Sequence, residues 1–357
     1  MATDETVFLT GFPGFIASRL LRRLARESGR YLLLVQPVFA KRAEAELIRI
    51  AEEANKPISD FRVLQGDITQ PNLGMSERDI ERARAETTTV FHLAAIYDLA
   101  VTREVGMRVN VEGTRNVNQF ARSLPRLRHY HYVSTCYVAG KRTGVIFENE
   151  LRHAAGFRNY YEETKYLAEV EVDELKSELP ITIHRPSVVC GDSRTGETVK
   201  YDGIYYLIRY LLKWPALLSA FNIGNSAVSL NLVPVDFVVN AMAALARDPL
   251  AIGKIVQLAD PAPLTTQELF NEIARTLAGR EALLTLPASL VESSLMMSVS
   301  PKLTGLPHTG VPYFFLKQAY DTAQARTLLE PRGISCPAFR SYVGAIVDYA
   351  ARHPVLK

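Results

Sequence analysis

Short apolar segments alternate with helical patterns through the first half of the chain, and this rhythm restricts its fold more than any other feature. Segments with the character of strands occur at 6–10, 31–35, 61–65, 88–92, 129–134 and 181–185. The intervening residues carry apolar side chains at helical spacing. Largely apolar strands connected through helices predict a parallel sheet buried on both faces. We therefore expect an α/β fold with a Rossmann-like doubly wound parallel sheet.

The rhythm breaks after Ser187, which predicts a second region. One more strand is expected at 255–258, after a helix that follows Val233-Pro234-Val235-Asp236. We predict a dinucleotide-binding domain over residues 1–190, to which residues 228–260 return. Residues 191–227 and 261–357 are predicted to form a smaller, mainly helical C-terminal substrate-binding lobe.

The charge balance and the cysteine spacing argue against several classes of protein. Lys and Arg number 41 and Asp and Glu 38, a net charge of +3, and the basic residues are scattered, so no nucleic-acid partner is expected. Three distant cysteines offer no metal-ligand spacing, so no metal is expected. The most apolar stretch, 203–221, is interrupted by Arg209, Lys213 and Pro215, which argues against a transmembrane segment. Together with the acidic first residues, this predicts a cytoplasmic protein, as a monomer or homodimer.

A glycine-containing turn lies between the first predicted strand and the first predicted helix. Gly11 suits a tight turn, and Gly14 lets a pyrophosphate approach the backbone at a helix N-terminus. Ala17 stands at the third glycine position and is small enough for close helix–strand packing. The position of the turn predicts dinucleotide binding. The residues expected to contact the cofactor here are Thr10, Gly11, Phe12, Pro13, Gly14, Phe15 and Ile16.

The end of the second strand bears on the choice of dinucleotide. An NAD-binding chain usually carries an acidic residue there for the ribose 2′-hydroxyl, whereas this chain has Gln36 followed by proline. Lys41 and Arg42 follow, and they either meet a 2′-phosphate or face solvent on a helix. NADP(H) is therefore favoured, and NAD(H) remains possible.

Tyr161 and Lys165 are four residues apart on a predicted helix, so they share one face, whereas Tyr160 points elsewhere. An ammonium near a phenol favours the phenolate, which lowers a pKa that starts near ~10. A tyrosine tuned in this way can exchange a proton near neutral pH. This spacing is common by chance and carries little weight alone.

Further short motifs accompany this pair in a fixed order. They are Gly66-Asp67-Ile68, His92-Leu93-Ala94-Ala95, Asn110-Val111-x-Gly113-Thr114, Val133-Ser134-Thr135, Arg185-Pro186-Ser187 and Val233-Pro234-Val235-Asp236. In this order the chain resembles the extended short-chain dehydrogenase/reductase family. Residues 133–140 and 185–196 look like its fatty acyl-CoA reductase and thioester reductase branch, of the male-sterility type. The resemblance covers residues 6 to about 260.

The resemblance implies roles for individual residues. Tyr161 would transfer the proton, Lys165 would lower its pKa and bind the nicotinamide ribose, and Thr135 would hydrogen-bond the substrate oxygen. Further cofactor contacts are expected from Gln36, Lys41, Asp67, Ile68, Ala94, Ala95, Asn110, Pro186, Ser187 and Val188. For Asn110, support of a bend in the active-site helix is the alternative role. Substrate contacts are expected from Tyr97, Thr135, Cys136, Tyr205 and Trp214.

The implied activity is NADP(H)-dependent reduction of a carbonyl on an apolar acyl substrate, either an acyl thioester or an aldehyde or ketone. The thioester would arrive on CoA or on a carrier protein. An apolar lid would come from Tyr205, Tyr206, Leu211, Leu212, Trp214 and Leu217, or these residues merely pack the lobe. Two alternatives remain open: an NAD-dependent sugar-nucleotide epimerase or dehydratase, and a non-catalytic cofactor-sensing protein.

Overall fold

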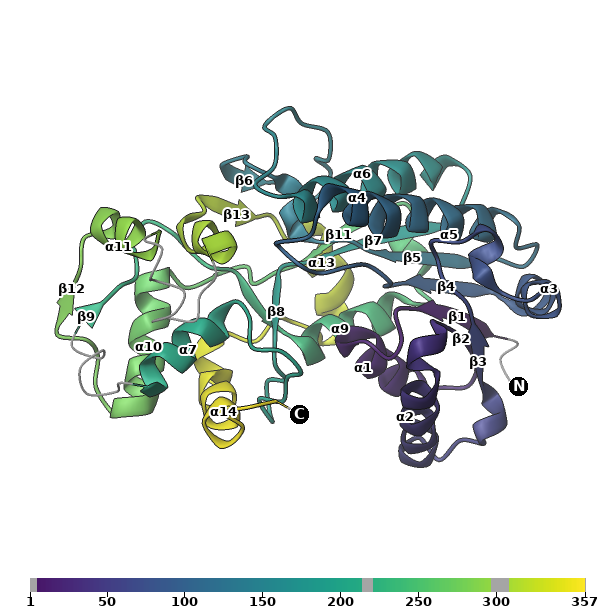
Figure 1. Ribbon diagram of the computed structural model, residues 1–357, viewed down its shortest axis with the longest axis horizontal. Coiled ribbons are helices and arrows are strands. Elements are labelled where there is room, and N and C mark those ends of the chain that lie inside the picture. Colours follow the sequence, from purple (N-terminus) through teal and green to yellow (C-terminus); the bar gives the residue numbers. More distant parts are fainter. Residues whose placement is uncertain (1–4, 214–220, 297–307, 357) are drawn as a thin grey trace.

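Seven apolar strands form one parallel sheet in the computed structural model, which describes residues 5–213, 221–296 and 308–356 (Figure 1). The order across the sheet is β11 (Ile255–Leu258), β7 (Ile181–Pro186), β5 (His129–Val133), β4 (Thr89–His92), β1 (Thr6–Thr10), β2 (Arg30–Val35) and β3 (Phe61–Gln65). The predicted strands and the doubly wound class are confirmed.

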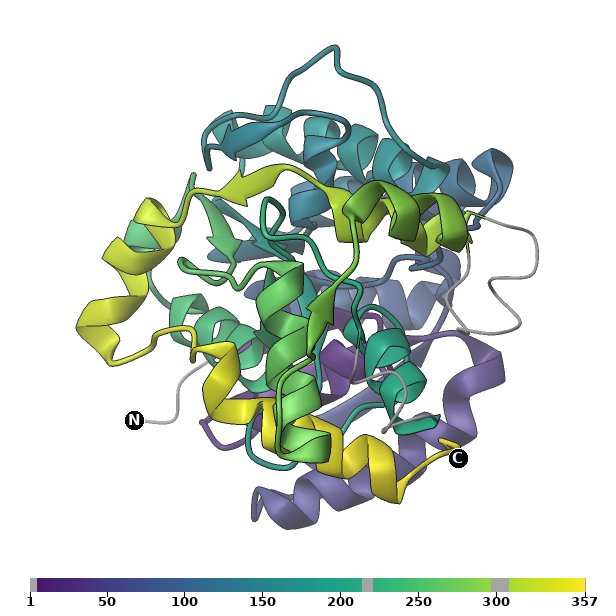
Figure 2. The same ribbon diagram turned by 90° about the vertical axis from the view of Figure 1, so that its left-hand side faces the viewer.

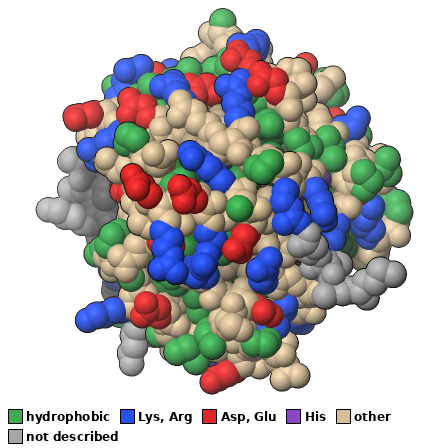
Figure 3. All heavy atoms as spheres, turned by 90° about the vertical axis from the view of Figure 1, so that its right-hand side faces the viewer, with side chains coloured by type: hydrophobic (Ala, Val, Ile, Leu, Met, Phe, Trp, Pro, Cys, Tyr) green, Lys and Arg blue, Asp and Glu red, His purple; other side chains and the backbone are tan. Residues whose placement is uncertain are grey.

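Helices cover both faces of the sheet because successive strand side chains point to opposite faces. Val7 and Leu9 enter one core and Phe8 enters the other. The first core is closed by α1 (Phe15–Leu24), α2 (Ala40–Glu53), α9 (Val235–Leu245) and α13 (Ala323–Leu329). The second is closed by α3 (Glu77–Glu86), α5 (Gly113–Arg122) and α6 (Tyr160–Glu174). On the α3 side of the molecule, basic and acidic side chains are interspersed (Figure 3).

The order of the strands reverses between β1 and β4, which are neighbours in the sheet. The glycine turn follows β1, and Leu93 to Ala95 follow β4, so both lie at the carboxyl edge of the sheet. Open α/β sheets bind ligands in the crevice at such a switch point. The fold therefore places two predicted cofactor segments side by side.

The helical spacing of apolar residues predicts helices over residues 15–28 and about 102–122, and the structure differs from both predictions in detail. The first ends at Leu24, four residues before its expected end at Ser28. The long helix expected near 102–122 is divided into α4 (Arg103–Gly106), a π-helical segment (Met107–Glu112) and α5. The wider π turn contains the buried Asn110, whose side chain bonds outside the helix.

A third core lies among α7 (Ile204–Lys213), α10 (Thr266–Ala278) and α14 (Phe339–Arg352), which lie apart from the seven-stranded sheet in Figure 1 and face the viewer in Figure 2. Thr265 and Glu268 cap α10, each bonding the other's backbone N–H. The remaining elements are β6 (Gly144–Ile146), which pairs with β13 (Gln318–Tyr320), β8 (Val188–Cys190), which pairs with β10 (Leu232–Pro234), β9 (Phe221–Asn222), which pairs with β12 (Leu284–Thr285), and α11 (Ala288–Leu295). The domain limits at 190, 227 and 260 stay a prediction. No described helix combines the length and the apolarity needed to cross a membrane.

A buried ion pair fastens α6 to the sheet. Arg185 on β7 and Glu169 on α6 have fully buried side chains, and Arg185 Nε donates to Glu169 Oε1 at 2.8 Å. Ser134, directly after β5, donates its hydroxyl to the same carboxylate. A second guanidinium nitrogen of Arg185 donates to the carbonyl of Glu150 at 3.2 Å. The pair therefore joins two strand ends, a loop and the helix.

We expect Arg185→Met to lower the free energy of unfolding by about 3–5 kcal/mol, because removing one partner leaves a buried carboxylate uncompensated. The matched control is Arg122→Met, whose ion pair with Glu178 is exposed. That change should cost about 0–1 kcal/mol. Urea unfolding of both variants measures the difference, and equal midpoints would contradict this assignment.

Candidate functional site

Tyr161, Lys165 and Thr135 line one cavity of about 390 Å³. Asn159 caps α6 by accepting the backbone N–H of Glu162 at 3.0 Å, so the helix begins just before Tyr161. Tyr161 is only 6% exposed, whereas Tyr160 is 46% exposed. The helix thus directs one of the two neighbouring tyrosines into the cavity and the other to solvent, as expected.

The protonation state of Tyr161 differs from the expectation. Burial raises the pKa of Tyr161 well above its ordinary value, and a hydrogen bond with the Thr135 side chain opposes this rise. The charges of Glu162 and Asp202 add to the increase. The predicted lowering of this pKa by Lys165 is therefore wrong for the chain alone, and the phenol is held protonated.

The reason lies in how Lys165 is bound. Its ammonium donates to the carbonyl of Val133 at 2.9 Å and to the hydroxyl of Tyr132 at 3.0 Å, so it is fixed to β5. Burial lowers the pKa of Lys165 to about 8, and the charge of Glu169 opposes this change. At neutral pH, Lys165 is therefore charged in most molecules.

The glycine turn fits a dinucleotide because its surface is backbone. Gly11 has φ 91°, and a Cβ there would lie 2.9 Å from the backbone nitrogen of Ala94. A Cβ on Gly14 would lie 2.6 Å from the carbonyl oxygen of Gly11. The Thr10 hydroxyl accepts the N–H groups of Leu93 and Ala94 at 3.2 and 3.1 Å, which holds the two loops together.

A second cavity, of about 500 Å³, extends from the same turn and shares Gly11, Gly14, Ala94 and Ala95 with the first. Its lining includes Thr10, Phe12, Pro13, Gln36, Asp67 and Ile68. Phe15, Ile16, Pro186, Ser187 and Val188 line the first cavity. The structure thus brings these expected cofactor residues together along one continuous surface, whose length and bare backbone suit a dinucleotide.

Two of the expected cofactor residues lie outside these cavities. Arg42 lines the second cavity near Gln36, but the exposed Lys41 does not. Asn110 lines neither cavity: it accepts the N–H of Ile96 at 2.9 Å and donates to the Thr164 hydroxyl at 3.0 Å. The structure thus places Asn110 outside both cavities, where it ties the loop after β4 to α6 beside Lys165.

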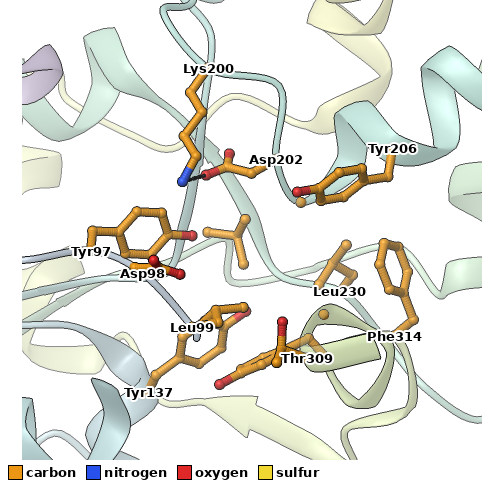
Figure 4. Close-up of a pocket in the computed structure, with 14 residues that line it drawn as sticks. Tyr97, Asp98, Leu99, Tyr137, Lys200, Asp202, Tyr206, Leu230, Thr309 and Phe314 are labelled. Atoms are coloured by element: carbon orange, nitrogen blue, oxygen red, sulfur yellow. Dashed lines mark ion pairs between the residues drawn. The ribbon is translucent and has the colours of Figure 1, made fainter. Parts of the chain in front are cut away.

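A third cavity adjoins the first and shares Tyr97, Tyr137, Val188, Lys200 and Asp202 with it (Figure 4). The ring of Tyr97 meets that of Tyr161 edge-on, with centroids 5.2 Å apart. The ammonium of Lys200 lies 3.4 Å from the Asp202 carboxylate and 5.0 Å above the Tyr97 ring. The third cavity, of about 90 Å³, thus adjoins Tyr161 through the ring of Tyr97.

The lining of the third cavity is aromatic and partly polar, which differs from the predicted apolar lid. Figure 4 shows the hydroxyls of Tyr97, Tyr206 and Thr309 pointing into the open space. Apolar contacts come from Leu99, Leu230 and Phe314. Thr309, Gly310, Tyr313 and Phe314 come from a C-terminal 3₁₀ segment, His308–Phe315, where sequence reasoning found no motif.

Several expected substrate residues lie elsewhere. Tyr205 and Leu211 are buried in the third core, and Leu212 packs against it, because these residues turn away from the cavity on α7. Cys136 is buried, with its thiol directed to the carbonyl of Arg185 at 3.1 Å. The structure thus places Tyr205 and Cys136 outside the lining of the third cavity. Trp214 and Leu217 lie outside the described residues.

Comparisons with known proteins agree with this geometry. The family model described as male sterility protein matches residues 9–242. The fatty acyl-CoA reductase wat of Drosophila melanogaster is 26% identical over 284 residues, which are 69% of this chain and 54% of that protein. The chain spans about half the length of the curated acyl-CoA reductases that it matches.

Solved structures show the same likeness. The terminal R domain from the myxalamid PKS-NRPS biosynthetic pathway has a TM-score of 0.82 and 26% identity, covering 99% of this chain and 92% of that one. UDP-glucuronic acid 4-epimerase from Bacillus cereus, in complex with NAD, has a TM-score of 0.66 and 18% identity, covering 98% and 97%. The second likeness concerns the fold alone.

We expect Gly11→Ala to weaken dinucleotide binding by about tenfold or more, equivalent to about 1.4 kcal/mol. The added Cβ meets the backbone of Leu93 and Ala94 and must displace the turn. Gly279→Ala is the matched control, because Gly279 has φ 68° and open space around it. That change should cost about 1 kcal/mol of stability and leave binding intact. Calorimetric titration with NADPH compares the two variants, and equal affinities would contradict the assignment of the glycine turn to dinucleotide binding.

Proposed function

Because the chain belongs to the male sterility protein family, within the extended short-chain dehydrogenase/reductases, we propose that it reduces the carbonyl of an acyl thioester. The observation that carries this proposal is the position of Tyr161 in the first cavity, next to the third. Tyr161 lines the cavity that fits a dinucleotide, and its ring meets that of Tyr97, which lines both cavities. Addition of a hydride and a proton to the carbonyl would give a hemithioacetal. Its C–S bond would then break as the hydroxyl proton passes to sulfur, so the products would be an aldehyde and a free thiol.

The side chains suit the direction of reduction. A bound nicotinamide dinucleotide would supply the hydride. Tyr161 would donate a proton to the carbonyl oxygen, and its raised pKa keeps that proton in place until charge develops on the oxygen. Thr135 would hydrogen-bond the same oxygen. Lys165, fixed to β5 by two hydrogen bonds, would present its remaining donor capacity to the ribose hydroxyls.

The thioester would enter through the third cavity, carried by CoA or by a carrier protein. Relatives of both kinds support this: acyl-CoA reductases and an R domain of a PKS-NRPS pathway. The acyl group would contact Leu99, Leu230 and Phe314, and its first polar atoms would meet the hydroxyls of Tyr97 and Tyr206. Because the wall is partly polar, chain length alone should not determine affinity.

The function is tested by NADPH oxidation with acyl-CoA substrates from C2 to C16. We expect Tyr161→Phe to lower turnover by about 10² to 10⁴ while leaving dinucleotide affinity unchanged, as for a lost general acid. Tyr160→Phe, on the exposed face of α6, is the matched control and should retain turnover. Equal turnover of the two variants contradicts the proposed role. Activity confined to sugar nucleotides would replace the thioester by the epimerase alternative.

We propose further that the dinucleotide is NADPH and that Arg42 binds its 2′-phosphate. Gln36 follows β2 at the position where an acidic side chain would hold a ribose 2′-hydroxyl. Its amide instead donates to the Asp67 carboxylate at 2.9 Å. Arg42 lines the same cavity and pairs with no carboxylate among the described residues.

We therefore expect Arg42→Gln to weaken NADPH binding by about tenfold, the contribution of one charge-assisted hydrogen bond, and to leave NADH binding unchanged. Lys41→Gln, on the same helix but outside the cavity, is the control and should bind both as wild type does. Calorimetric titrations give the four affinities. NADH binding as tightly as NADPH in the wild type would overturn the cofactor assignment.

A further inference from the structure

Tyr313 connects the C-terminal segment to the helix that carries Tyr161. Its hydroxyl donates to Glu162 Oε1 at 2.6 Å and accepts from Asn159 Nδ2 at 2.8 Å. These partners are more than 150 residues away in sequence. Tyr313 is 5% exposed, and Glu162 is fully buried. The phenol therefore spans the two residues that flank Tyr160 and Tyr161.

The same turn of α6 is closed by bonds within the helix. Asn159 accepts the N–H of Glu162, while the Glu162 carboxylate accepts the N–H of Arg158 at 2.9 Å. The Arg158 guanidinium lies 3.3 Å from that carboxylate and also donates to the carbonyl of Gly140. Tyr313 is thus the member of this ring of hydrogen bonds that comes from outside the 140–162 region.

The aromatic side chain of Tyr313 also forms part of the cavity wall. It lines the third cavity and packs against Tyr137, with centroids 4.5 Å apart. Tyr137 lines both the first and the third cavity. One side chain therefore forms part of the substrate wall and, through its hydroxyl, holds the turn that positions the proton donor.

Resting on the function proposed above, we propose that Tyr313 is a positioning residue. It holds Tyr161 within hydrogen-bond reach of the carbonyl of a substrate bound in the third cavity. A phenol that must lie within hydrogen-bond reach of the reacting oxygen is sensitive to small displacements. The buried carboxylate that Tyr313 orients also adds to the raised pKa of Tyr161, which keeps the donor protonated. The role of Tyr313 is thus exerted through Tyr161.

The decisive variant is Tyr313→Phe, which keeps the ring in the cavity wall and removes only the hydroxyl. We expect kcat for the acyl-CoA to fall by about tenfold, because the first turn of α6 loses its outer support. KM should change by less than about twofold, because the ring contact with substrate is retained. NADPH affinity, measured by calorimetry, should not change.

Tyr320→Phe is the matched control. This change also removes one hydroxyl, but Tyr320 lies on β13 and its hydroxyl donates to Gln318 at 3.0 Å and not to α6. It should retain kcat and KM. Asn159→Ser provides a second variant, since serine preserves the helix cap and removes the amide that donates to Tyr313. It should lower kcat in the same direction as Tyr313→Phe.

A double-mutant cycle separates positioning from general support of the fold. In the Tyr161→Phe background there is no phenolic proton to position, so adding Tyr313→Phe should leave the residual turnover unchanged. A full tenfold further loss would show a merely structural role and overturn the inference. So would equal kcat values for Tyr313→Phe and Tyr320→Phe. If Tyr161→Phe itself retains full turnover, the proposed function fails instead.

Discussion

The contact on which the site depends is the buried ion pair between Arg185 and Glu169. Tyr161, Lys165 and Glu169 recur at four-residue spacing, so they form one stripe along α6. Glu169 is bound to β7 through Arg185 and to the end of β5 through Ser134, and Lys165 is bound to β5 at Val133. With these two turns fixed to the strand ends, the next turn must extend past the edge of the sheet, and Tyr161 is carried into the cavity. Buried charges are costly when unpaired, so each member of the stripe requires its partner, and this requirement fixes the register of the helix.

The same burial sets the protonation of the two groups in opposite senses. Desolvation disfavours the charged form of each, so the pKa of Tyr161 rises and that of Lys165 falls to about 8. The Lys165 ammonium donates to the carbonyl of Val133 on β5. It therefore stabilises this backbone oxygen and not a phenolate at Tyr161. A protonated tyrosine is the form that the proposed reduction requires, because it must donate to a carbonyl oxygen.

The sequence predicted those parts of the fold that follow from the hydrophobic pattern of the strands and from glycine positions in the backbone. Apolar strands revealed the sheet, and Gly11 and Gly14 marked the cradle because a Cβ is excluded at both positions. Side-chain direction in the second lobe was not predictable: Tyr205 and Tyr206 are neighbours on α7, yet one is in a core and the other lines the substrate cavity. Apolar content alone cannot distinguish a lid from a packed helix. The C-terminal segment at 308–315 carried no signal because its residues act through contacts distant in sequence.

The cofactor side and the proposed substrate side of the site are therefore under different structural constraints. The cofactor half is formed largely by backbone around Gly11 and Ala94, where almost any added atom collides. The substrate half is formed by side chains from separate loops, which can change without moving the sheet. Under the proposed function, such a division would let one scaffold accept different acyl groups, provided that the cavity wall still supports the proton donor. Tyr313 would provide that support through its hydrogen bond to Glu162, so a change in this segment would also affect Tyr161. Variation should then be freer at Thr309, which lines the cavity, than at Tyr313.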